Sequence, residues 1–129
     1  MAILDKALIF FNNEVIDSES IANIDLGAGG DAIGQELTLT IVANEAISGD
    51  PMQFVLGTLD APAATLDDVG TYESKGALVV SPLNSAKPAG AIIFQCRVPK
   101  GAKRYLYLVE YNGSGSSGKK ITAYLSKEL

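Results

Sequence analysis

One stretch of the sequence has the spacing of a phosphate-binding loop. Gly27, Gly29 and Ala32 follow a predicted strand and fit the pattern G-x-G-x-x-A. In a dinucleotide site such glycines open a helix, whose first N–H groups and dipole hold the pyrophosphate. Residues 35–43 instead alternate with a period of two and are rich in threonine, which predicts a strand. We therefore interpret the glycines as a bend with positive φ, or as a loop held by another subunit, and expect no cofactor.

Other residues that could do chemistry are few. The chain has no histidine and a single cysteine, Cys96, which excludes zinc sites of the Cys/His kind and an internal disulfide. The acidic residues, including Asp67 and Asp68, lack the spacing of a calcium loop and are interpreted as solvated. Cys96 shares its strand parity with Phe94 and Val98, which is typical of a small buried hydrophobe. We expect no metal, no catalytic residue and no enzymatic activity.

A basic cluster surrounds a Pro-Lys-Gly turn. Arg97, Lys100, Lys103 and Arg104 place four positive charges within eight residues. Nucleic-acid binding usually requires a basic domain with aromatic platforms, whereas this chain has a net charge of −5 and a pI near 4.6. The cluster therefore fits an acidic protein partner better than nucleic acid, and ordinary solvated charge explains it equally well.

Tyrosines dominate one face of the strand predicted at residues 104–111. Tyr105, Tyr107 and Tyr111 share that face, and the opposite face carries leucines. A strand with two apolar or amphipathic faces is expected to be covered on both sides. Tyrosine is enriched at protein interfaces because it covers apolar surface and keeps a polar end. The tyrosine face is therefore either internal core or a contact surface.

Length and composition indicate one globular domain spanning residues 1–129. The chain is 47% hydrophobic, which is enough for a core. Residues 1–74 carry 13 acids and one base, and residues 75–129 carry two acids and nine bases. This division permits an acidic face and a basic face, although chance and solubility explain it equally well. No apolar run approaches the roughly 20 residues that span a bilayer, and the start lacks the features of a signal peptide.

The dominant hydrophobic period is two, which predicts strands rather than helices. The helical candidate at residues 61–73 is interpreted as a loop with one turn, and the Gly/Ser-rich stretch at residues 111–120 as a mobile hairpin tip or one ordered by a neighbour. The sequence therefore predicts an all-β, single-domain, jelly-roll-like β-sandwich of about eight antiparallel strands. The strands are expected within residues 8–11, 21–26, 35–45, 53–57, 75–80, 91–99, 104–111 and 119–127.

The alternation also assigns a core face to three of these strands. Apolar side chains at every second position are expected to point inward, and the polar positions between them outward. The predicted core-facing residues are Leu37, Leu39, Ile41 and Ala43 in the first of these strands, Ile92, Phe94, Cys96 and Val98 in the second, and Ile121, Ala123 and Leu125 in the third.

Several motifs in order resemble a known family. The sequence opens with "LIFFNNEVI" and "SIANIDLGAGGDAIGQELTLTIVA", and continues with "VPKGAKRYLYLVEYNGSG" and "KKITAYL". This order resembles the small cement, or decoration, proteins of tailed-bacteriophage capsids, of the type found on a Bordetella phage head. The resemblance runs nearly the length of the chain and is weakest between residues 45 and 90. The order of the motifs carries it, since each alone has low specificity.

The resemblance implies a structural role without catalytic residues. It implies a jelly roll on the outer surface of the virion, made in the bacterial host cytoplasm. Such a protein lies across junctions between major capsid protein subunits, commonly as a dimer, and binds neither nucleic acid nor membrane. Arg104 and Tyr105 match the family's most recognisable dipeptide, and Arg104 either contacts the capsid or ties the turn to a neighbouring strand. The candidate capsid or subunit interface comprises Arg97, Lys100, Lys103, Arg104, Tyr105, Tyr107 and Tyr111.

The alternative function is a carbohydrate- or receptor-binding β-sandwich module of a virion fibre. The absence of tryptophan counts against stacking on sugars, although tyrosine can take that place. Binding to glycans rather than to phage heads distinguishes the two.

Overall fold

The structure, a computed structural model, describes residues 8–16, 21–27, 37–47, 52–62, 76–83, 87–111 and 119–127. These residues contain eight strands. They confirm the eight predicted strands. The predicted single turn beyond residue 62, most of the glycine loop and the hairpin tip lie outside the described residues. The strands are β1 (Ile9–Ile16), β2 (Ile21–Asp25), β3 (Leu37–Ala43), β4 (Met52–Leu59), β5 (Ala77–Leu83), β6 (Ile92–Arg97), β7 (Tyr105–Tyr111) and β8 (Lys119–Lys127).

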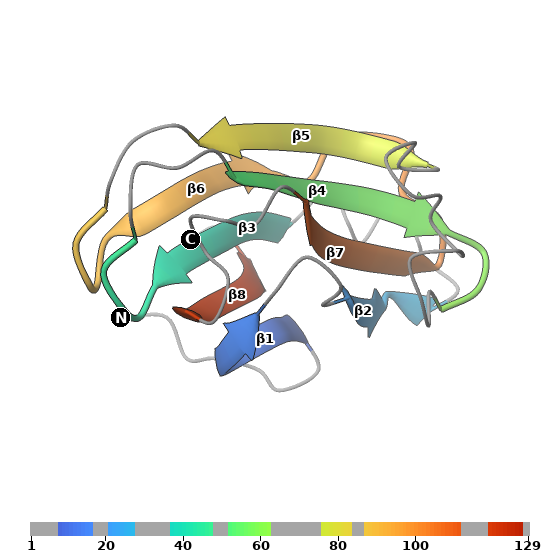
Figure 1. The fold of residues 1–129 in the computed structure, drawn as a ribbon. Coiled ribbons are helices and arrows are strands. Elements are labelled where there is room, and N and C mark those ends of the chain that lie inside the picture. The colour runs from blue at the N-terminus through green and yellow to red at the C-terminus, as the bar shows by residue number, and fades with distance from the viewer. Residues whose placement is uncertain are drawn as a thin grey trace.

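The strands form two four-stranded antiparallel sheets, as Figure 1 shows. Sheet A has the order β1-β8-β3-β6, and sheet B has the order β2-β7-β4-β5. β1 pairs with β8, β2 with β7, β3 with β6 and β4 with β5, so the first four strands form one long hairpin with the last four. Folding that hairpin into two layers gives a jelly roll. The end of β2, the end of β4 and the start of β7 meet at one end of the sandwich.

The core lies between the two sheets. Leu37, Leu39, Ile41 and Ala43 of β3 are buried, and so are the three apolar positions predicted to face inward on β8. Sheet B contributes apolar side chains from β4 and β7 to the same cluster. Each buried aliphatic or aromatic side chain stabilises the fold by about 1.5–3 kcal/mol relative to exposure. The inward faces predicted for β3 and β8 are therefore confirmed. The sheet B residues in this core cluster are Phe54 and Leu56 of β4 and Leu106 and Leu108 of β7.

The inward face predicted for β6 is wrong at its first residue. Ile41 pairs with Phe94 and Val42 pairs with Ile92, so Ile93 is an extra residue in β6. Such a β-bulge reverses the alternation of side chains on the residues before it. Ile93 therefore joins the core at 8% exposure, whereas Ile92 is 50% exposed. Phe94, Cys96 and Val98 all contact the core as predicted.

A second apolar cluster covers the outer face of sheet B. Tyr107 is 1% exposed and packs with Val55 and Val109, against half-buried Ile21 and Leu59. β7 is therefore covered on both sides, as predicted. The placement of Tyr107 in an interface is corrected, because its ring is already buried within a single chain and needs no second subunit as cover.

Candidate protein-interaction site

The basic turn connects β6 to β7 over residues 98–104 and is anchored at its base. The Val98 N–H donates to the Leu37 carbonyl at 3.0 Å. Within the turn, the side chains of Val98 and Ala102 are buried. Gly101 has a φ of 102°, which a side chain would disfavour. These anchors leave Lys100 exposed at the tip of the turn.

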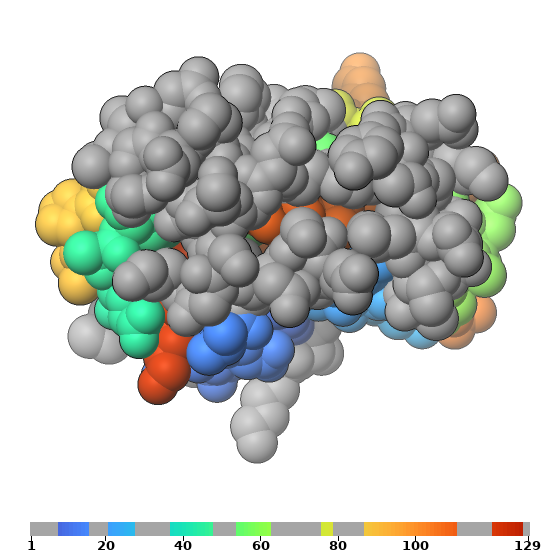
Figure 2. Space-filling model, in the orientation of Figure 1, coloured from blue at the N-terminus to red at the C-terminus, as the bar shows by residue number. Residues whose placement is uncertain are grey.

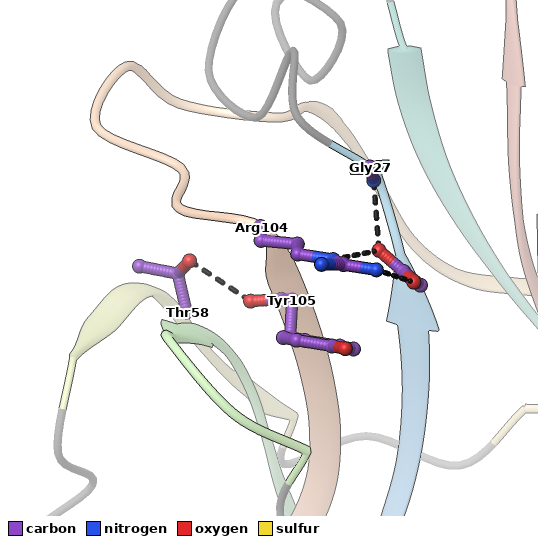
Figure 3. Close-up of polar contacts among 5 residues, drawn as sticks. Gly27, Thr58, Arg104 and Tyr105 are labelled. Atoms are coloured by element: carbon purple, nitrogen blue, oxygen red, sulfur yellow. Dashed lines mark hydrogen bonds and ion pairs between the residues drawn. The ribbon is translucent and has the colours of Figure 1, made fainter.

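A buried threonine of β4 fixes the end of the turn. The Thr58 hydroxyl accepts the Lys103 N–H at 2.6 Å. It also donates to the Tyr105 carbonyl at 2.9 Å (Figure 3). Thr58 is only 4% exposed, so water cannot readily replace either bond. The backbone from Lys103 to Tyr105 is thereby held against β4.

Arg104 ties the same turn to β2. Its Nε and Nη2 donate to the two carboxylate oxygens of Asp25 at 2.9 and 3.0 Å (Figure 3). Its carbonyl accepts the Leu26 N–H at 2.7 Å. The guanidinium carbon lies 5.2 Å from the centre of the Tyr105 ring. A bidentate pair of this kind fixes orientation as well as distance. Arg104 therefore has the strand-tying contact that was one of its two expected roles.

The first residue of the glycine loop completes this arrangement. Gly27 has a φ of 72°, and its N–H donates to Asp25 Oδ1 at 2.8 Å. Asp25 thus receives hydrogen bonds from both the arginine and the loop backbone. Gly27 confirms the expected positive φ at the loop's start, and a strand, β3, follows the loop.

The hydrogen bonds to Asp25 make the stability of the protein depend on pH. The Arg104 guanidinium and then the Gly27 N–H hold the pKa of Asp25 below its ordinary value, and the same pair raises the pKa of Arg104. A carboxylate whose pKa is lowered on folding stabilises the folded state above its unfolded pKa and loses that effect as the pH falls through its folded pKa.

Asp25→Asn should therefore be less stable than the unaltered chain at neutral pH, by an amount that shrinks below about pH 4. Urea unfolding at a series of pH values from 7 to 2 measures this difference. Arg104→Gln should behave in the same way, since it removes the same pair. A difference that stays constant down to pH 2 would contradict the role assigned to the pair.

The four predicted cations are not equivalent. Arg104 is paired with Asp25, and the Lys103 Nζ lies 3.5 Å from Asp60 Oδ2 in an exposed pair that contributes little. Arg97 is exposed at the end of β6, and Lys100 has no described acid within ion-pair distance. Lys100 is thus the cation most open to a partner.

The three predicted interface tyrosines also differ in their surroundings. Tyr105 is half-buried beside Arg104, whereas Tyr107 lies in the outer cluster of sheet B. The side chain of Tyr111 lies outside the described residues. Of the three, Tyr105 alone is seen to adjoin the basic turn.

The residues that hold the turn were not among the predicted site residues. Asp25 and Thr58 lie 79 and 47 positions away from their partners in the sequence. Only the pairing of β7 with both β2 and β4 brings them together. The one local signal was the Asp25-Leu26-Gly27 tripeptide, which has the residue types of an Asx turn.

The remaining chemistry of the described residues is sparse. No group of three or more described His, Cys, Asp or Glu residues is placed to hold a metal ion. Burial raises the pKa of the Cys96 thiol, which disfavours the reactive thiolate. Within the described ranges, no helix is long and apolar enough to cross a membrane. The arrangement is suited to binding through a fixed turn.

No protein-family model matches the chain, and no curated protein matches it.

Proposed function

We propose that this chain is a capsid cement protein, which binds the outer surface of a tailed-phage head and clamps neighbouring major capsid protein subunits. The observation that carries the proposal is a basic turn fixed at the end of a jelly roll, with Lys100 exposed at its tip. The order of motifs along the sequence, which resembles that of phage cement proteins, supports the same role.

The way the turn is held suits this task. Its backbone bonds to Leu37 and Thr58 fix its shape before binding, so little conformational entropy is lost when a partner docks. A lysine on a fixed turn attracts an acidic surface of the capsid. A modest contact repeated over a shell, and doubled by dimerisation, gives high avidity. A net charge of −5 helps the free protein to stay soluble before it assembles.

The test is co-sedimentation with expanded, undecorated heads of the parent phage. The expected result is saturable binding at a fixed ratio to capsid subunits. Failure to pellet with heads, together with retention on a glycan array, would contradict the proposal and favour the carbohydrate-binding alternative. Light scattering of the free protein measures whether it is the expected dimer.

Lys100→Glu should lower the affinity for heads by about three- to tenfold at low ionic strength, because it reverses the charge at the tip of the turn. The loss should shrink as salt is added, since exposed charges are screened. The matched control is Lys87→Glu, which makes the same change in the β5–β6 connection at the other end of the sandwich. Equal affinity of the two variants would show that the basic turn does not contact the shell.

A further inference from the structure

The outer face of sheet A carries exposed hydrophobic side chains. Val15, 60% exposed, and Ile92, 50% exposed, are the two large apolar side chains most open to solvent among the described residues. Val15 pairs with Lys120 and Ile92 pairs with Val42. Lys120 and Val42 alternate with core residues of β8 and β3, so Val15 and Ile92 both lie on the face turned away from the core.

From Ile92 the paired outward positions run through Val42 to Thr122, which is one outward position along β8 from Lys120. The next row toward Arg97 holds Gln95, Thr40 and Tyr124, which face one another across β6, β3 and β8. The Gln95 Nε2 donates to the Thr40 Oγ1 at 2.9 Å, so these polar groups satisfy each other. In Figure 2 the described parts of β1 and β8 reach the surface side by side, in blue and red at the lower left. We call the outward positions of β1, β8, β3 and β6 the sheet A face.

The charge of the sheet A face is of one sign. Arg97 and Lys120 lie at its two ends, and none of its described outward positions is acidic. The exposed Glu14 of β1 pairs with the core-facing Ile121 and so is not an outward position. The whole chain, in contrast, has 15 acids and 10 bases. The complementary surface would set apolar side chains opposite Val15 and Ile92, and carboxylates opposite Arg97 and Lys120. A second copy of the same face offers no carboxylate to either cation, so charge disfavours self-pairing.

The size of the sheet A face also argues against self-pairing. Four strands about 4.8 Å apart, with about six residues along each, cover on the order of 400 Å². A stable pair of proteins usually buries about 800 Å² on each partner. The flat outline of this face is thus small for a stable dimer interface, and it fits a shell on which many copies bind at repeated sites.

We propose that the sheet A face lies against the capsid, on a protein surface that sets apolar side chains opposite Val15 and Ile92 and carboxylates opposite Arg97 and Lys120. This inference rests on the proposed function and names the contact for it. Arg97 ends β6 and leads directly into the basic turn, so the sheet A face and the turn form one continuous surface.

The experiment compares the binding of three proteins to expanded heads by co-sedimentation. The double variant Val15→Glu/Ile92→Glu should lose affinity at least about tenfold, because it removes apolar contact and adds two carboxylates to a face expected to meet acidic groups. The matched control is Ala77→Glu, an exposed strand position in sheet B. It should bind like the unaltered chain. Both variants are expected to unfold in urea close to the unaltered midpoint, since the positions are exposed.

The outcomes separate the two proposals. An unaltered chain that fails to pellet contradicts the cement function, and the capsid contact falls with it. An unaltered chain that pellets while the double variant pellets equally well overturns the sheet A face alone. A free dimer that the double variant converts to monomer also overturns it, because the face then binds a second copy.

Discussion

Gly57→Ala is expected to lower the free energy of unfolding by about 2–3 kcal/mol, the cost of overfilling a packed core. Gly57 pairs with Tyr107 across β4 and β7, and a Cβ at Gly57 would overlap the Cζ, Cε2 and Oη atoms of that ring. The ring cannot simply turn aside, because it is 1% exposed and packs with Val55 and Val109. The added methyl group therefore displaces the whole cluster on the outer face of sheet B.

A double-mutant cycle isolates this overlap. Leucine at position 107 lacks the distal ring atoms that meet the new Cβ, so Gly57→Ala should cost less than about 1 kcal/mol in a Tyr107→Leu background. Urea unfolding of the four proteins gives the coupling energy. If Gly57→Ala costs the same in both backgrounds, the Tyr107 ring is not the reason that position 57 lacks room for a side chain.

Thr58→Val is the second large expected effect, a loss of about 2–3 kcal/mol. Valine keeps the shape but not the hydroxyl, so the Lys103 N–H and the Tyr105 carbonyl lose a buried partner. Because these bonds hold the basic turn, the Lys103 amide should also exchange its hydrogen faster than in the unaltered chain. Urea unfolding and amide exchange measure the two effects.

Thr122→Val is the matched control for Thr58→Val. The Thr122 hydroxyl also makes two bonds, accepting the Asn13 N–H at 3.0 Å and donating to Asn44 Oδ1 at 2.6 Å, but at an exposed place. Water can replace it there, so the loss should stay below about 1 kcal/mol. Equal losses at the two threonines would argue that burial of Thr58 is not what fixes the turn.

The strands could be predicted from sequence because each leaves a local period of two. That period failed at Ile92, where the bulge depends on how β6 pairs with β3 and not on β6 alone. Similarly, alternation correctly grouped Tyr107 away from the leucines of β7. Whether the Tyr107 face of β7 is buried depends on residues distant in sequence. One such residue is Gly57 of the neighbouring strand β4, which leaves room for the Tyr107 ring.

The candidate site was predictable in its charges but not in its partners. Arg97, Lys100, Lys103 and Arg104 are adjacent in sequence, so their clustering is a local property. Which of these cations form ion pairs cannot be seen locally, because their partners Asp25 and Asp60 lie on β2 and just after β4. The sheet A face likewise could not be predicted from sequence. It joins strands that are distant in sequence, and the bulge in β6 turns Ile92 outward.

The central claim, that this jelly roll clamps capsid subunits, is tested most directly by electron cryo-microscopy of expanded phage heads saturated with the protein. We expect added density of jelly-roll shape at every equivalent junction between major capsid protein subunits, with the sheet A face and the basic turn toward the shell. Heads that show no added density under saturating protein would contradict the claim.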